Sequence, residues 1–145
     1  MSVTRILPQH IAGVAALEKE VFATPWSEKS LELLCGDAAF GFAVLEGDTV
    51  TAYGGMLTVL DEGQITNIAT HPSYRRRGLA AGVLTALLDE ARARGIALVT
   101  LEARVSNMAA IALYQKLGFS VVGKRPRFYT HPIEDALIMQ CILTS

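Results

Sequence analysis

A run of three arginines followed by small residues is the segment whose chemistry is easiest to infer. The segment consists of Arg75, Arg76, Arg77, Gly78, Leu79, Ala80 and Ala81. If a helix begins at this point, its free backbone N–H groups and its dipole favour a bound anion, and small side chains let a phosphate approach. The arginines add charge-assisted hydrogen bonds. The segment therefore predicts a phosphate site, although an ordinary solvated turn of arginines explains it equally well.

The charge distribution separates a local anion site from a nucleic-acid surface. Neither G-x-x-x-x-G-K-[ST] nor G-x-G-x-x-G occurs in the sequence. The formal net charge is −1, but residues 1–74 carry three basic and nine acidic groups and residues 75–145 carry ten and five. Nucleic-acid-binding proteins usually have an overall basic excess and a long basic stripe. We therefore expect a local phosphate ligand and no direct nucleic-acid partner.

Cysteine and histidine residues show no spacing typical of a metal or redox site. Cys35 and Cys141 are far apart and form no C-x-x-C motif, and His10, His71 and His131 form no H-x-x-x-H motif. The sequence therefore predicts no metal, and we expect both cysteines to be small core residues.

The composition predicts one folded domain over residues 1–145. Hydrophobic residues make up 51% of the chain and charged residues 19%, which is too apolar for a disordered chain. No apolar run approaches the roughly 20 residues that a membrane span needs, and residues 1–9 lack the features of a signal peptide. We expect a cytoplasmic protein with no membrane association.

Hydrophobic periodicity predicts alternating helices and strands in the first half of the chain. Apolar residues at helical spacing predict helices over 8–22 and 27–36, the second with Ser27 as its N-cap. Runs of β-branched and aromatic residues predict strands over 3–6, 40–46, 50–59 and 64–70. The last three read as an antiparallel meander.

The second half predicts a strand-helix-strand unit and then further elements. The strongest helical pattern covers 78–94 and ends at Gly95, and a second helix covers 107–117 and ends at Gly118. Strands are predicted over 96–102, 119–124 and 136–143. This order indicates an α/β (α+β) domain with a mixed central sheet of six to seven strands flanked by about four helices.

Two motifs in this half carry a resemblance to a known family. The segment from Arg75 to Ala80 is similar to the [RQ]-x-x-G-x-[GA] signature of the GCN5-related N-acetyltransferase (GNAT) superfamily. The segment from Asn107 to Phe119 resembles its downstream N-x-x-A-x-x-L-Y-x-x-x-G-F core. Along nearly its full length the chain resembles the bacterial RimI-type ribosomal-protein-alanine N-acetyltransferases, for example in Pro25-Trp26-Ser27 and Thr66-Asn67-Ile68-Ala69. The resemblance implies a single GNAT domain and acetyl-coenzyme A as cosubstrate, with no metal.

The resemblance also implies which residues hold the cosubstrate. The expected cofactor-binding residues are Ile68, Ala69, Thr70, Arg75, Arg76, Arg77, Gly78, Leu79, Ala80, Ala81 and Asn107. The arginine turn would hold the pyrophosphate, and the backbone of the strand around Ile68 would bind the pantetheine arm and polarise the thioester oxygen. Asn107 would bind the same arm and could equally serve as a helix N-cap.

Two residues are expected to be catalytic on the same grounds. Glu102 matches the general base of the RimI-type enzymes, whereas the residues alone favour a surface carboxylate paired with Arg104 on the same strand face. Tyr114 matches the residue that protonates the departing thiolate, and otherwise reads as a core aromatic. A phenol of pKa ~10 and a thiol of ~8.5 make that transfer uphill by only about 2 kcal/mol.

The acceptor is expected to be an α-amine that attacks the thioester directly in a ternary complex. Deprotonation at pH 7 costs about 1.4 kcal/mol for an α-amine and about 4.6 kcal/mol for lysine. Trp26, Tyr129 and Glu134 would form its groove, and the acidic pair Glu134 and Asp135 would favour a basic peptide. By resemblance the acceptor is the N-terminal alanine of a small-subunit ribosomal protein.

Alternative functions remain at this point. They are an acetyltransferase for lysine side chains or small amines, and a non-catalytic sensor of coenzyme A. The sequence does not give the oligomeric state, and we expect a monomer or weak dimer.

Overall fold

A single seven-stranded sheet runs through the part of the chain that the structure describes. The computed structural model describes residues 2–143. The strands are β1 (Val3–Arg5), β2 (Ala39–Glu46), β3 (Thr49–Val59), β4 (Glu62–Thr70), β5 (Leu98–Arg104), β6 (Ser120–Thr130) and β7 (Ile133–Ile142). Their order in the sheet is β1-β2-β3-β4-β5-β7-β6. The predicted mixed sheet is therefore confirmed.

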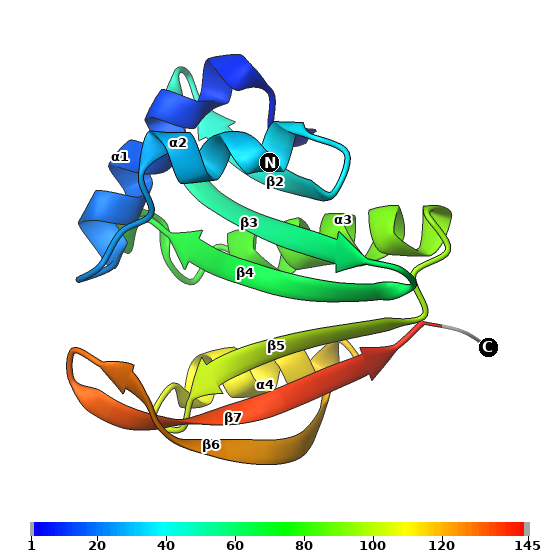
Figure 1. The fold of residues 1–145 in the computed structure, drawn as a ribbon. Coiled ribbons are helices and arrows are strands. Elements are labelled where there is room, and N and C mark those ends of the chain that lie inside the picture. The colour runs from blue at the N-terminus through cyan, green and yellow to red at the C-terminus, as the bar shows by residue number, and fades with distance from the viewer. Residues whose placement is uncertain (1, 144–145) are drawn as a thin grey trace.

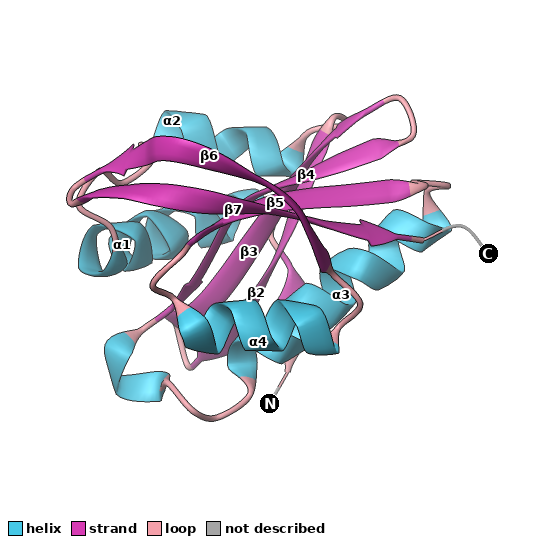
Figure 2. Cartoon of the chain, turned by 90° about the horizontal axis from the view of Figure 1, so that it is seen from below, coloured by secondary structure: helices cyan, strands magenta, loops and turns pink. Residues whose placement is uncertain are grey.

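Helices cover both faces of this sheet. They are α1 (Ile11–Val21), α2 (Glu28–Leu31), α3 (Leu79–Ala93) and α4 (Met108–Lys116), with short 3-10 turns at Pro8–His10, Glu32–Cys35 and Pro72–Tyr74. The pair α1 and α2 packs on one face and the pair α3 and α4 on the other (Figures 1 and 2). Two hydrophobic cores result, one around Val14 and Leu31 and one around Val83 and Leu87. The predicted stripes of α1 and α3 supply Val14, Val83 and Leu87, and α2 supplies Leu31.

The sheet opens in its middle, between β4 and β5. These two strands are parallel and are joined through α3, and every other neighbouring pair is antiparallel. Their pairing covers only Glu62 with Leu98, Gly63 with Val99 and Gln64 with Thr100. Beyond this contact the strands diverge, as Figure 1 shows. The edge of β4 that faces β5 therefore has no strand partner from residue 65 onward.

A β-bulge in β4 changes which face its side chains reach. Pairing with β3 shifts between Gly54–Ile68 and Met56–Ile65, which inserts one extra residue into β4. Ile65 and Ile68 pack in the core beneath α3. Asn67 contacts α1 on the opposite face. Because a bulge interrupts the alternation of a strand, two neighbouring residues share one face here.

The turn before α3 has the backbone expected of an anion-binding helix start. Gly78 is the N-cap in a left-handed conformation with φ of +75°. Arg76 also has a positive φ, of +64°. A glycine adopts this conformation without a steric penalty, so the chain can reverse tightly and leave the first N–H groups of α3 open.

Three sequence-based expectations are corrected. The segment 27–36 forms the short α2 and a 3-10 turn in place of one helix, although Ser27 caps it as expected. Cys35 is exposed and does not belong to the core. The strand expected over 119–124 continues as β6 to Thr130, so Arg125 and Arg127 lie within it, because an edge strand tolerates a proline and charged residues.

Candidate active site

A cavity of about 610 Å³ lies where β4 and β5 diverge. It is lined by residues of the segment between α1 and α2, of β4 and β5, of α4 with its cap, and of the β6–β7 hairpin. These are Val21, Phe22, Ala23, Thr24, Trp26, Ile65, Thr66, Asn67, Ile68, Leu101, Glu102, Ala103, Arg104, Asn107, Tyr114, Phe128, Tyr129, Thr130, His131 and Pro132. Six of the residues that the sequence proposed for function are therefore in one cavity.

The lining residues come from both faces of the sheet. Along β5, Leu101 and Ala103 are buried toward α3 and α4, and the alternate residues Glu102 and Arg104 face the other side. Tyr114 reaches the cavity from α4. Two ligands can therefore approach the gap between β4 and β5 from opposite faces and meet inside it.

Glu102 is half-buried and forms no salt bridge among residues 2–143. One carboxylate oxygen accepts a hydrogen bond of 2.9 Å from Gln64 Nε2 across the gap. Among residues 2–143 no hydrogen bond uses the other oxygen, and the ion-pair partner of Arg104 is Glu134 at 3.1 Å. The pairing of Glu102 with Arg104, which the residues alone favoured, is thus absent from the described structure. Glu102 retains an oxygen that can take a proton.

Tyr114 is both a core aromatic and a residue of the cavity wall. Its ring packs near that of Phe119 at a centroid distance of 6.0 Å, and only 8% of the residue is exposed. Burial, reinforced by nearby Tyr129, raises the pKa of Tyr114 to about 12. The hydroxyl therefore stays protonated at neutral pH and can donate a hydrogen bond.

The expected cosubstrate residues lie along one path from the cavity to the start of α3. Ile68 and Asn107 line the cavity, and the Asn107 side chain also caps α4 by accepting from the Ala110 N–H at 3.3 Å. Ala69 is buried and Thr70 ends β4. The remaining expected residues form the exposed turn and the first turn of α3. Both roles proposed for Asn107 are thus open to it.

The three arginines of this turn have no acidic partner among residues 2–143. Arg75, Arg76 and Arg77 are exposed and take part in none of the salt bridges there. Arg77 lies over the ring of Tyr74 at 4.9 Å. Their charges remain available to an anion at the helix start.

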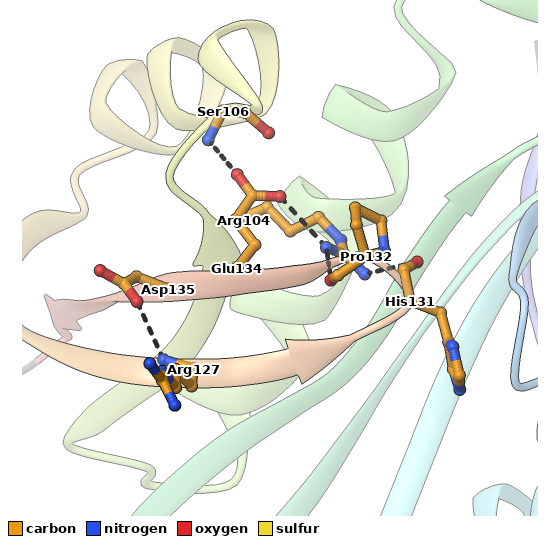
Figure 3. Close-up of polar contacts among 7 residues, drawn as sticks. All are labelled: Arg104, Ser106, Arg127, His131, Pro132, Glu134 and Asp135. Carbon is orange, nitrogen blue, oxygen red and sulfur yellow. Dashed lines mark hydrogen bonds and ion pairs between the residues drawn. The ribbon is translucent and has the colours of Figure 1, made fainter.

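Of the three residues expected to form the acceptor groove, Trp26 and Tyr129 line the cavity and Glu134 does not. The guanidinium of Arg104 lies 4.3 Å from the centre of the Tyr129 ring and donates to the carbonyls of His131 and Pro132 (Figure 3). Glu134 accepts from Arg104 at 3.1 Å and from the Ser106 N–H at 2.7 Å. Glu134 therefore holds the hairpin that carries Tyr129.

Asp135, the second acidic residue expected near the acceptor, also bonds within the chain. This carboxylate accepts from the Arg127 N–H at 2.9 Å and pairs with Lys124 at 3.3 Å. These bonds lower the pKa of Asp135, and the bond from Ser106 lowers the pKa of Glu134. Both carboxylates are engaged within the chain, and neither lines the cavity.

Sequence reasoning missed Glu18, which is completely buried beside the cavity. It lies on the stripe of α1 formed with Ile11, Val14 and Val21, and the first two of these are buried. An acidic residue at a position where helical spacing demands an apolar one was the available signal. Asn67, its partner, entered the sequence argument only as part of a motif.

The open sheet, the exposed cationic turn and the carboxylate in a two-sided cavity define a transferase that brings two substrates together. The model of the acetyltransferase (GNAT) family matches residues 11–119. The chain belongs to this family.

Curated relatives and solved structures agree with this assignment. The [ribosomal protein bS18]-alanine N-acetyltransferase of Escherichia coli K12 is 41% identical over 125 residues, which are 85% of this chain and 84% of the relative. The enzyme of that name from Haemophilus ducreyi is 33% identical over 141 residues, or 95% and 97%. The crystal structure of the E. coli ribosomal-protein-S18-alanine N-acetyltransferase superposes with a TM-score of 0.90 at 35% identity, covering 99% and 94%.

Two further features of the described residues concern metals and membranes. Within 2–143, no group of three or more His, Cys, Asp or Glu side chains is arranged to hold a metal ion. In the same range no helix combines the length and apolarity required to cross a bilayer.

Proposed function

We propose that this acetyltransferase moves an acetyl group from acetyl-coenzyme A to the N-terminal α-amine of a ribosomal protein, with an N-terminal alanine as in bS18 as the acceptor. The observation that carries the proposal is Glu102, which lines the cavity and has one carboxylate oxygen without a hydrogen-bond partner among residues 2–143. The names of relatives that are 33 to 41% identical support the choice of acceptor.

The residues present fit the expected cosubstrate. The unpaired edge of β4 from residue 65 offers backbone N–H and C=O groups to the pantetheine amides. The open N–H groups after Gly78, small residues at 80 and 81 and the free arginines suit the pyrophosphate. Acetyl-coenzyme A supplies a thioester, and an N–H near Ile68 would polarise its carbonyl oxygen.

Glu102 acts as the general base in this proposal. Its free oxygen accepts a proton from the attacking amine, directly or through one water. The cost of about 1.4 kcal/mol for deprotonating an α-amine at pH 7 suits a single carboxylate better than the roughly 4.6 kcal/mol for lysine. Gln64 holds the other oxygen and so fixes the direction of the free one.

Tyr114 stabilises the departing thiolate mainly through a hydrogen bond. With its pKa raised to about 12, complete proton transfer to a thiol of pKa ~8.5 costs about 5 kcal/mol, more than the 2 kcal/mol expected for an ordinary phenol. We expect Tyr114→Phe to lower kcat roughly ten- to a hundredfold, the contribution of one charge-assisted hydrogen bond, and to leave the KM for acetyl-coenzyme A unchanged. Steady-state kinetics measure both, and unchanged kcat would contradict the role.

The amine attacks the thioester directly, without an acyl-cysteine intermediate. Cys35 is exposed and Cys141 lies on β7, and neither lines the cavity. Replacing both by alanine should therefore retain turnover. Loss of activity in a folded double variant would contradict direct attack.

The decisive test is mass-spectrometric acetylation of three acceptors in equal amounts. They are a peptide with a free N-terminal alanine, a blocked peptide with an internal lysine, and a small polyamine. Wild type should modify only the α-amine, and Glu102→Gln should lower this rate about 10² to 10⁴-fold. Glu46→Gln, an exposed glutamate at the end of β2, is the matched control and should retain the rate.

The other outcomes select an alternative function. Modification of only the lysine peptide or the polyamine would assign the enzyme to a different acceptor. Binding of coenzyme A without any product would favour a sensor. Full activity in Glu102→Gln would exclude Glu102 as the base.

A further inference from the structure

The buried carboxylate of Glu18 is the feature that the proposed chemistry leaves unexplained. Its exposed fraction is 0%, and no salt bridge among residues 2–143 includes it. Burial of a charge without a cation is costly, and well-packed apolar residues usually serve stability as well or better. A role beyond packing is therefore expected of this side chain.

Three donors from three different segments satisfy the carboxylate. Oε1 accepts from the backbone N–H of Trp26 at 2.8 Å. Oε2 accepts from the Tyr53 hydroxyl on β3 and from Asn67 Nδ2 on β4 at 2.9 Å. We name these four residues the Glu18 cluster. The cluster ties α1 to the sheet and to the segment before α2, whose residues line the cavity.

The cluster determines how the Asn67 amide is turned. A carboxylate only accepts hydrogen bonds, so it attracts the NH₂ end of Asn67 and repels the carbonyl oxygen. The bulge in β4 brings Asn67 to this face, and Asn67 is also part of the cavity wall. No hydrogen bond among residues 2–143 uses its Oδ1. Asn67 therefore lines the cavity with its Nδ2 bound to Glu18 and its Oδ1 without a partner among residues 2–143.

We propose that Glu18 is a positioning residue for the acceptor amine, because it holds Asn67 with Oδ1 directed to accept a hydrogen bond from an N–H of that amine. This inference rests on the proposed function. An attacking amine has one proton for Glu102 and another N–H that needs an acceptor. With Asn67 on β4 and Glu102 on β5, the two acceptors lie on the two strands that bound the gap. Together they orient the nitrogen lone pair toward the cosubstrate.

A double-variant cycle tests whether Glu18 acts through Asn67. Asn67→Ala should lower kcat/KM for the alanine peptide about tenfold, the size of one neutral hydrogen bond, with KM for acetyl-coenzyme A unchanged. Glu18→Gln puts an NH₂ group opposite the NH₂ group of Asn67. Rotation of the Asn67 amide relieves this conflict between two donors. The same loss of about tenfold should result. The double variant should be no worse than Asn67→Ala, because each change removes one shared interaction.

Glu20→Gln, an exposed glutamate further along α1, is the matched control. It removes the same charge from the same helix at a position that does not contact Asn67. It should leave the melting temperature unchanged and kcat/KM for the peptide within about twofold. This separates the contact between Glu18 and Asn67 from the loss of an acidic charge on α1.

The remaining outcomes overturn the inference in distinguishable ways. Multiplied losses in the double variant, or an unchanged kcat/KM in Asn67→Ala, would overturn it while the proposed function stands. Absence of wild-type turnover on the alanine peptide would overturn both. Circular dichroism of each variant excludes unfolding as the cause. If Glu18→Gln does not fold, Glu18→Asp, which keeps the charge but withdraws the acceptor from Asn67, takes its place in the cycle.

Discussion

The two walls of the cavity are held by different chemistry. On the β4 side, Glu18 is completely buried and accepts three hydrogen bonds from neutral donors. On the β5 side, Arg104 holds the β6–β7 hairpin through an ion pair with Glu134. The side chain of Arg104 is 29% exposed and that of Glu134 is 15% exposed. Water and salt therefore reach the second set of contacts more readily than the first. We therefore expect the β4 side of the cavity to be rigid. We expect the stability of the β5 side to depend on salt and pH.

The largest expected effect comes from removing the buried carboxylate. Glu18→Ala should lower the free energy of unfolding by about 3 to 5 kcal/mol, because buried donors lose their acceptor and a cavity forms. Urea unfolding monitored by circular dichroism measures it. Glu20→Ala on the exposed side of α1 is the control and should stay within about 0.5 kcal/mol. A loss below about 1 kcal/mol for Glu18→Ala would remove the distinction between the walls.

The sequence predicted those parts of the fold and site that depend on local pattern. Strands β2, β3 and β4 and helix α3 were predicted correctly because their apolar residues recur at the period of one element. Glu102 and Tyr114 were named because the resemblance marked them, and the structure adds their common cavity. Local pattern and motif thus located the elements that bring these residues together.

Contacts between distant segments could not be predicted in this way. The bulge that lets Asn67 face α1 depends on pairing between β3 and β4, and strict alternation counted from Ile65 assigns this side chain to the other face. Glu134 pairs with Arg104, 30 residues away, a contact that no local sequence pattern indicates. Both cases depend on partners that no period within one element specifies.

A smaller effect is expected at the hairpin. Arg104→Leu should lower the free energy of unfolding by about 1 kcal/mol, because a partly exposed ion pair and two bonds to carbonyls are lost. The KM for the peptide should rise, since Tyr129 loses its support.

Urea unfolding and peptide kinetics test this change together. Arg92→Leu, which breaks the more exposed pair with Asp89, is the matched control and should change neither quantity appreciably. If Arg104→Leu leaves both the stability and the peptide KM at wild-type values, the hairpin is held by its strand pairing alone.

The smallest effect is a dependence on pH at the same wall. Hydrogen bonds from Ser106 and then the Arg104 guanidinium hold the pKa of Glu134 below its ordinary value of 4.5. A carboxyl group with a lowered folded-state pKa stabilises the protein above its unfolded pKa, and this contribution is lost as the pH falls through the folded value. The stability difference between wild type and Glu134→Gln should therefore be constant above about pH 5 and shrink below about pH 4.

Thermal unfolding of both proteins across this pH range measures the difference. Asp135 also has a lowered pKa, and it remains in Glu134→Gln, so the variant should keep part of the acid sensitivity of this wall. Parallel curves for the two proteins would mean that Glu134 keeps its bonds without gaining from its charge. The hairpin would then resemble the β4 side of the cavity, where the Glu18 carboxylate sets the geometry by accepting hydrogen bonds. Neither salt nor acid would then loosen the hairpin.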